Sequence, residues 1–208
     1  MKEEILQTSL KQFLKYGIRE MSIQKLVEPL GISTKTVYKY FKNKEELLEE
    51  ALHLYHGKQY ETLENRPAEQ NAACAFFDVW QTGVELEYKV NKVFYHDLHY
   101  YYPELEGKVD AAITKKFEQH FLSIIHRGIK QGAFRKDILP EVALQSVFIL
   151  YRGAVRTEHF KSFRLSANDI LLNTIASYIR GLCTEKGIQA LDEHIRIFQA
   201  YRGVKMAR

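Results

Sequence analysis

The sequence predicts an all-α protein, and three observations support this fold class. Apolar residues recur at intervals of three and four along nearly the whole chain, as the buried face of an amphipathic helix requires. No stretch of apolar–polar alternation is bounded by turn residues, as a half-buried strand would be. With 208 residues, 46% of them hydrophobic and only four Pro, the chain is long enough for one sizeable core or two small ones, and disorder is excluded.

The first two expected helices are separated by a turn, and the second is expected to be short. Apolar residues at helical spacing place the first helix over residues 5–14, and Gly17 stands where a left-handed cap would end it. Ser22 is placed to cap the second helix, and Pro29 is expected to end it early. Gly31 then allows a tight turn.

The third helix is expected to span about two turns, and the fourth to be longer. Ser33 is the N-cap candidate of the third helix, and Val37 and Phe41 lie one turn apart on the inner side of that helix. Asn43 opens the fourth helix with the spacing of a capping box. This helix is expected to continue until a break in composition at residues 65–67.

Beyond that break the expected helices lengthen and become more apolar. Apolar periodicity marks a fifth helix over residues 72–84 and a sixth over residues 90–101, which Pro103 stops. The seventh, over residues 105–129, ends near Gly132.

Two of the remaining helices are apolar around most of their circumference, over residues 142–155 and 170–183. Such helices are buried on both sides, so we expect them to form a two-fold homodimer interface. The alternative is that each is a central helix covered by its own chain. The last helix is expected over residues 188–201, after Gly187. The expected interface residues are Phe148, Tyr151, Val155, Leu171, Ile175, Tyr178, Ile179 and Leu182.

Composition also excludes a membrane span and a disulfide framework. The longest apolar runs are about five residues, against the roughly 20 that a bilayer core requires. The first ten residues lack the basic start and apolar stretch of a secretory signal, so we expect a cytoplasmic protein. Cys74 and Cys183 are expected to be small buried apolar residues.

The distribution of charge is more informative than its total. The net charge is +4, from 30 Lys and Arg against 26 Asp and Glu, and +3 of it lies in residues 1–47. Residues 33–44 contain four lysines and no acid. Two short helices joined by a glycine turn, the second basic and capped by a serine, meet the physical requirements of a helix-turn-helix over residues 22–41.

The same residues resemble the TetR family of transcriptional regulators. The resemblance is dense over residues 1–55, and a weaker one follows the expected seventh helix. In the first region it is carried by Phe13, Gly17, Gly31, Ile32, Ser33, Thr36, Val37, Tyr38, Tyr40, Phe41, Lys44 and Leu47. In the second it is carried by Gly128, Gly132, Phe134, Arg135 and Asp137.

The resemblance implies a three-helix DNA-binding domain over residues 1–60 and a helical effector-binding and dimerisation domain over residues 61–208. It implies a ligand-responsive repressor that acts as a homodimer on a pseudo-palindromic operator in double-stranded DNA. A helical-cavity enzyme or a ligand carrier that retains the DNA-binding head is the alternative. No phosphate-binding glycine loop, Gly-x-Ser-x-Gly motif or Cys/His array is present, so we expect no enzyme and no cofactor.

The expected DNA contacts fall into three groups. Lys35 and Lys39 are expected to reach base edges, where lysine donates to guanine acceptors. For Tyr38 and Tyr40 the resemblance implies hydroxyl contacts to phosphate oxygens, with burial in the core as the alternative. It also implies a phosphate clamp for Lys44. Lysines on a solvated face are the alternative. The complete expected set is Ser22, Ser33, Thr34, Lys35, Thr36, Tyr38, Lys39, Tyr40 and Lys44.

The effector, if one binds, is expected to be hydrophobic or aromatic, since aromatic residues recur along the fifth to eighth helices. Plain hydrophobic core is the alternative reading of the same residues. His96 and His99 have the spacing of two ligands on one helical face, but without a third ligand we expect no metal. The candidate effector contacts are Phe77, Trp80, Tyr88, Phe94, Tyr95, Tyr101, Phe121 and Tyr151.

Overall fold

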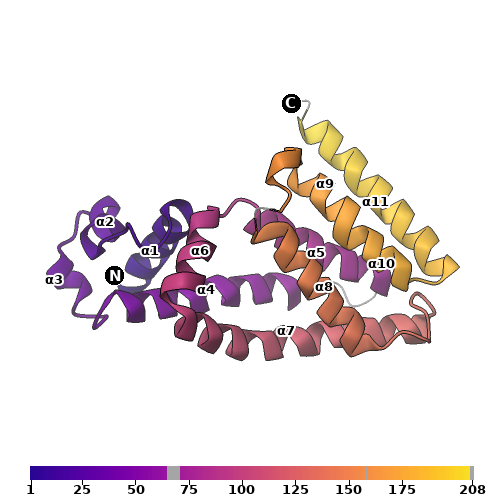
Figure 1. Cartoon of the computed structure of the whole chain (residues 1–208), viewed down its shortest axis with the longest axis horizontal. Helices are drawn as coiled ribbons and strands as arrows, with labels where there is room; N and C mark the ends of the chain where they lie inside the picture. Colours follow the sequence, from indigo (N-terminus) through magenta and orange to yellow (C-terminus); the bar gives the residue numbers. More distant parts are fainter. Residues whose placement is uncertain (65–70, 158, 207–208) are drawn as a thin grey trace. The chain divides into compact units, whose positions relative to one another are not determined.

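The computed structural model describes residues 1–64, 71–157 and 159–206, and within these ranges every regular element is helical. The predicted all-α class is therefore confirmed. No helix of the described ranges combines the length and apolar character needed to cross a bilayer. The α-helices are α1 (Lys2–Tyr16), α2 (Ile23–Val27), α3 (Thr34–Val37), α4 (Lys44–Glu64), α5 (Ala72–Glu87), α6 (Lys92–Tyr101), α7 (Pro103–Gln131), α8 (Pro140–Val155), α9 (Ala167–Leu171), α10 (Ser177–Leu182) and α11 (Glu185–Met206) (Figure 1).

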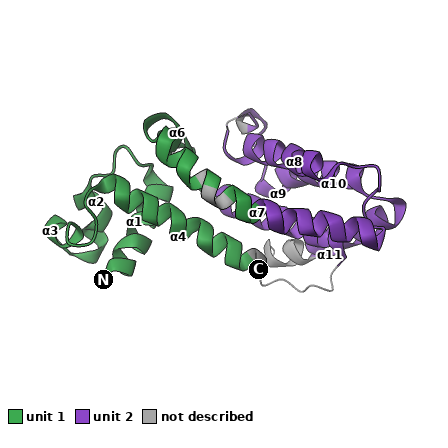
Figure 2. Cartoon of the chain, turned by 90° about the horizontal axis from the view of Figure 1, so that it is seen from below, with its two compact units in different colours: residues 1–66, 88–117 green, residues 67–87, 118–208 purple. Residues whose placement is uncertain are grey.

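The chain folds as two compact units, shown in green and purple in Figure 2. Unit 1 consists of Met1–Arg66 and Tyr88–Phe117, and unit 2 of Pro67–Glu87 and Glu118–Arg208. Helix α7 therefore begins in unit 1 and ends in unit 2. The functional division expected at residue 60 stays a prediction, and the composition break at residues 65–67 lies outside the described residues.

Unit 1 has one hydrophobic core, to which the first four helices and α6 all contribute. Helix α1 packs against α2, α4 and α6. Phe13 and Phe41 are buried in this core together with Phe94 of α6. Burying a Phe side chain contributes roughly 1.5–3 kcal/mol, so the core binds α6 firmly to the first helices.

Unit 2 is built around α5, which packs against α8, α9 and α11. Three faces of α5 are therefore covered, and this explains why its sequence is almost continuously apolar from Ala72 to Phe77. The loop after α7 is joined to the end of α10 by an isolated bridge between Phe134 and Cys183.

The helix expected over residues 170–183 is interrupted by a π-helical segment, Leu172–Ala176, between α9 and α10. The Ser177 hydroxyl donates to the Leu172 carbonyl, five residues back, at 2.9 Å. A π segment adds one residue to a turn and changes which side chains face the core after it. Apolar periodicity alone did not reveal it.

The expected start of the last helix after Gly187 was wrong. Helix α11 begins at Glu185, and the Thr184 hydroxyl accepts a hydrogen bond from the Gly187 N–H at 3.1 Å. A Cβ at Gly187 would lie 2.0 Å from the Ala133 carbonyl oxygen. Glycine is present here because the first turn of α11 touches the backbone of the loop after α7, and not because a helix starts after it.

Candidate nucleic-acid interface and effector core

The helix-turn-helix is formed by α2, a 3₁₀ turn that contains Pro29, and α3. Gly31 has φ +63°, a left-handed conformation that lets the chain reverse before α3. The Ser22 hydroxyl accepts from the Lys25 N–H at 3.3 Å, so it caps α2. These turns and this cap are where the sequence predicted them.

Helix α3 is also capped as predicted, by Ser33. Its hydroxyl accepts from the Thr36 N–H at 3.3 Å and lies 3.2 Å from the Thr36 hydroxyl. Thr34 and Thr36 are both partly buried. The hydroxyls of Ser22 and Ser33 therefore serve as helix caps in this structure, and their contact with DNA stays a prediction.

The inner and outer sides of α3 differ sharply. Val37 and Phe41 are buried in the core of unit 1, as predicted. Lys35 and Lys39 are exposed on the outer side. Tyr38 and Tyr40 are 55% and 39% exposed, so their hydroxyls reach solvent and not the core. This surface is basic, carries hydroxyl donors and is narrow, as entry into a major groove requires.

Lys44 lies at the start of α4, but its ammonium group points to the turn between α1 and α2. Its Nζ donates to the Ile18 carbonyl at 2.6 Å and to the Arg19 carbonyl at 3.3 Å. Burial lowers the pKa of Lys44, and the carboxylates of Asp97 and Glu20 partly oppose this effect. Lys44 thus supports the backbone of unit 1, while the phosphate-clamp role stays a prediction.

Asp97 of α6 holds the same turn from the other side, and the sequence analysis gave it no role. Its Oδ2 accepts from the backbone N–H groups of Ile18 and Arg19, both at 2.8 Å, and the residue is 4% exposed. Gly17 has φ +87°, and a Cβ there would lie 2.7 Å from Val93 Cγ1 and 2.9 Å from Asp97 Oδ2. The glycine therefore allows both the turn and the close approach of α6.

Further contacts join α6 and the loop before it to the end of α1 and the turn that follows it. The Asn91 N–H donates to the Leu14 carbonyl and its Nδ2 to the Lys15 carbonyl, both at 3.0 Å. Arg19 donates to the Tyr101 hydroxyl at 2.8 Å, and its guanidinium lies 4.9 Å from the Tyr101 ring centroid. Since the last carbonyls of a helix need partners, Asn91 also serves as the C-terminal cap of α1.

The eight candidate effector residues are divided between the two units. Tyr88, Phe94, Tyr95 and Tyr101 belong to unit 1. Within it, Phe94 and Tyr95 are core residues, Tyr88 faces the Lys92 ammonium, and Tyr101 faces Arg19 on the surface. Phe77, Trp80, Phe121 and Tyr151 belong to unit 2. Their contact with an effector stays a prediction.

Unit 2 brings Trp80, Phe121, Phe148 and Tyr151 into one aromatic cluster. The centroid of Trp80 lies 5.1 Å from that of Phe121 and 5.2 Å from those of Phe148 and Tyr151. Phe77 lies apart from it and contacts His194 and Phe198 of α11 at 6.0 and 5.8 Å. Of the candidates in unit 2, three therefore share one site.

The expected dimer residues are mostly covered by their own chain. Phe148 and Tyr178 are partly exposed, while the other six are buried within unit 2. Burial in one chain thus explains the wide apolar arcs of α8 and of α9 to α10, and contact with a second copy stays a prediction. The six are Tyr151, Val155, Leu171, Ile175, Ile179 and Leu182.

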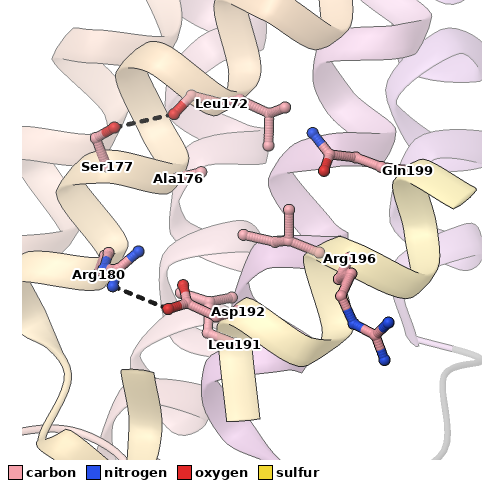
Figure 3. Close-up of a pocket in the computed structure, with 9 residues that line it drawn as sticks. Leu172, Ala176, Ser177, Arg180, Leu191, Asp192, Arg196 and Gln199 are labelled. Carbon is pink, nitrogen blue, oxygen red and sulfur yellow. Dashed lines mark hydrogen bonds and ion pairs between the residues drawn. The ribbon is translucent and has the colours of Figure 1, made fainter. Parts of the chain in front are cut away.

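An open groove of about 350 Å³ lies between the π segment with α10 on one side and α11 on the other (Figure 3). Its apolar lining includes Leu172, Ala176 and Ile195. At its end Arg180 of α10 pairs with Asp192 of α11 at 2.9 Å. The groove presents apolar surface beside charged groups on the outside of unit 2.

His96 and His99 do not converge on a common point. His99 Nδ1 lies 2.9 Å from Glu106 Oε2, whereas the His96 ring stacks on Tyr100 at 5.8 Å between centroids. Among the described residues no group of three or more His, Cys, Asp or Glu side chains is arranged to hold a metal ion.

Residues 5–51 match the sequence model of the bacterial regulatory proteins of the tetR family. Residues 5–51 are therefore a TetR-type DNA-binding region. This region contains the helix-turn-helix described above, so the protein is a DNA-binding transcriptional regulator.

Relatives that match most of the chain agree with this assignment. The transcriptional repressor KstR2 of Mycolicibacterium smegmatis is 23% identical over 193 residues, which cover 89% of this chain and 92% of that protein. FadR of Bacillus subtilis, solved with stearoyl-CoA, has a TM-score of 0.70 at 20% identity and covers 88% of this chain and 98% of its own. RolR, solved with resorcinol, has a TM-score of 0.59 at 14% identity and covers 93% of this chain and 92% of its own. The two structures establish a shared fold.

The second TetR-like segment has a packing role in unit 2. A Cβ at Gly128 would lie 2.2 Å from Phe134 Cδ2, so the glycine makes room for this buried ring. Gly132 has φ +69° and ends α7 in a left-handed turn. The Phe134 ring then packs on Phe76 with centroids 5.9 Å apart. The motif therefore turns the chain from α7 back into the core.

Proposed function

We propose that this chain is a ligand-responsive repressor that binds a pseudo-palindromic operator as a homodimer. The observation that carries the proposal is the capped helix α3, which buries Val37 and Phe41 and exposes Lys35 and Lys39. A dimer of this class presents two such helices about 34 Å apart to successive major grooves. Like other regulators of this kind, it would act in the cytoplasm, where the operator DNA is.

Within the operator we assign base-edge contacts to Lys35 and Lys39, because both are exposed on α3. Phosphate contacts are assigned to Tyr38 and Tyr40, whose exposed hydroxyls donate. Thr34 and Thr36 at the start of α3 are placed for further phosphate or base contacts. Ser22 and Ser33 contribute mainly by capping α2 and α3.

The experiment that tests DNA recognition is selection of bound duplexes from a random pool by the purified chain. We expect an enriched palindrome, and affinity for it that falls steeply with salt, by roughly 0.9 in the log–log slope for each phosphate neutralised. Equal affinity for random duplexes and for the enriched sequence at physiological salt would overturn the proposal.

For the homodimer we propose the outer surface of α11 and the groove beside it in Figure 3. Two observations on α11 support the proposal: Ile197 is 58% exposed, and the groove combines the apolar Leu172, Ala176 and Ile195 with charged groups. Ile197→Glu is expected to yield monomers in sedimentation analysis. The matched control is Ile149→Glu on α8, where Ile149 is 72% exposed. Dissociation by the α8 variant alone would assign the interface to α8, one of the two helices that the sequence suggested.

For the effector we propose a molecule with an apolar or aromatic body that binds the aromatic cluster of unit 2. The ligands solved with FadR and RolR, stearoyl-CoA and resorcinol, support ligand binding on this fold and span this range of chemistry. If the effector lowers the affinity of the chain for DNA, DNA must lower the affinity for the effector by the same factor. This reciprocity distinguishes a regulator from a simple carrier. We also infer that the chain acts by binding and not by catalysis, since the matched relatives are regulators.

Mass spectrometry of small molecules extracted from the purified chain tests the effector proposal directly. A bound compound that lowers operator affinity would support it. A bound compound whose affinity is the same with and without operator DNA would favour the carrier alternative.

A further inference from the structure

Trp80 is the single tryptophan of the chain, and its indole is enclosed by the aromatic cluster of unit 2. The rings of Phe121, Phe148 and Tyr151 surround it at centroid distances of 5.1 to 5.2 Å. The residue is only 3% exposed, so bulk water does not solvate the indole nitrogen. The environment of this nitrogen is therefore decided by what lies inside the cluster.

The indole N–H of Trp80 has no hydrogen-bond acceptor among the described atoms. Buried donors in native proteins are nearly always paired with a protein atom, a water or a bound molecule. The phenylalanine rings beside it present only ring faces and C–H edges, which are weak partners for an N–H group. An oxygen atom that enters the cluster would therefore find an unpaired donor in the Trp80 indole N–H.

One charged pair at the ends of α5 and α8 is already compensated, which favours a neutral guest. Glu87 at the end of α5 is 2% exposed and accepts two hydrogen bonds from Arg156, each at 3.0 Å. This bidentate pair leaves the two charges compensated by one another. A charged guest would lose its hydration without gaining a counter-ion of its own, whereas a neutral acceptor avoids this cost.

Phe148 is the ring of the cluster that lies nearest to solvent. It is the least buried of the four rings and meets the Trp80 ring edge-on. Edge-on and tilted pairs at these distances are the contacts that an aromatic guest also makes. A flat guest beside Trp80 would thus make ring contacts of the same kind as Phe148 makes.

We propose that the effector is a neutral molecule with a flat apolar or aromatic body and one oxygen that accepts the Trp80 indole N–H. This inference rests on the proposed function in so far as unit 2 holds the effector. It narrows the ligand class from apolar molecules in general to those with a carbonyl- or hydroxyl-type oxygen beside the flat body, and it makes Trp80 the residue that selects for that oxygen.

The experiment uses the full chain and two probes of nearly equal shape, acetophenone and ethylbenzene, of which only the first carries an acceptor oxygen. Binding is followed by nuclear magnetic resonance of the indole N–H, which gives one signal because there is one tryptophan. We expect acetophenone to bind about two- to tenfold more tightly, the range of one hydrogen bond, and to move this signal downfield. Ethylbenzene is expected to leave the signal near its unliganded position.

Two variants test whether Trp80 causes the preference for acetophenone over ethylbenzene. Their binding of both probes is measured by calorimetry. Trp80→Phe keeps a ring and removes the N–H, so it should bind both probes equally, while Tyr151→Phe removes a neighbouring hydroxyl and should keep the preference. Heat unfolding of each variant shows that it is folded. Equal binding of the probes to the natural chain, no binding of either, or a preference that survives in Trp80→Phe would overturn the inference.

Operator binding is measured on the same samples, so that the two proposals fail separately. If the probes behave equally while the chain still selects its palindrome, the effector inference fails and the repressor proposal stands. If the chain selects no palindrome, the repressor proposal fails whatever the probes do.

Discussion

The carboxylate of Asp97 accepts a 2.8 Å hydrogen bond from the backbone N–H of Ile18, 79 residues away in the sequence. Through it, and through the matching bond from Arg19, helix α6 determines the course of the turn that leads into the helix-turn-helix. The carboxylate gives these two N–H groups a hydrogen-bond acceptor that the turn itself does not supply.

Asp97→Asn should destabilise the chain by about 1–3 kcal/mol. Both backbone N–H groups donate to the same carboxylate oxygen, and a neutral amide oxygen in its place accepts these bonds more weakly. Thermal unfolding measures the loss, and operator affinity is expected to fall with it. Asp137→Asn is the control, since Asp137 pairs with Arg135 at the exposed surface and should change stability by less than about 1 kcal/mol. Equal effects of the two substitutions would contradict the assigned role of Asp97.

Lys44→Met should lower stability by about 1.5–3 kcal/mol, because the Ile18 and Arg19 carbonyls lose a charged donor. It should also weaken binding to all DNA sequences by a similar factor. Lys42→Met, at an exposed lysine two residues earlier, is the control for the loss of one positive charge and should leave the unfolding midpoint almost unchanged. Loss of DNA affinity by Lys44→Met without loss of stability would show that its ammonium serves phosphate alone.

Lys39→Ala should change the sequence preference of the chain, because a base-edge donor contributes about 1–3 kcal/mol of discrimination between bases. The measurement is a repeat of the random-pool selection, with the enriched palindromes compared. The control is Lys42→Ala, which should lower affinity without altering the preferred bases. An unchanged palindrome for Lys39→Ala would move Lys39 from base to phosphate contact.

Gly187→Ala should be among the most damaging single substitutions in unit 2. Its methyl group would lie 2.0 Å from the Ala133 carbonyl, so α11 or the loop after α7 must shift. Gly153→Ala on α8 has nothing within 4 Å of the added Cβ and should stabilise the chain by about 0.5–1 kcal/mol through helix propensity. Opposite signs in the unfolding midpoint are therefore expected for the same chemical change.

Cys74 and Cys183 should be inert in the folded chain, because burial raises their pKa values to about 11 and about 12 from the usual 9.0. A thiol reagent at pH 8 is expected to label neither residue in the native state and both in denaturant. Since the folded pKa values lie above the unfolded ones, the contribution of the thiols to stability is complete below pH 9 and is lost as the pH rises toward 12. The double substitution Cys74→Ser and Cys183→Ser should reduce the decrease in folding stability above pH 9. The same decrease in the substituted chain would contradict a contribution from the two thiols.

The helix-turn-helix was predictable from the sequence because its signals are local. Ser22 and Ser33 cap helices within three residues of themselves, and Gly31 adopts its left-handed turn without any distant contact. Val37 and Phe41 also lie on the same side of one short segment, so their burial follows from spacing alone. The DNA contacts expected on the opposite side of that segment stay predictions.

The contacts between distant segments were not predictable, because no spacing in the sequence records them. The pairing of Asp97 with the turn at Ile18, the redirection of Lys44 to the same turn, and the contact of Gly187 with Ala133 all join segments more than 20 residues apart. The sequence by itself determined the all-α class, the order of the helices and the basic helix-turn-helix with its serine caps, since these depend on local periodicity, caps and turns. Only the tertiary structure decided which aromatic residues share a site, that a buried indole N–H lies unpaired among them, and that α6 holds the turn before α2, because these depend on which helix surfaces meet.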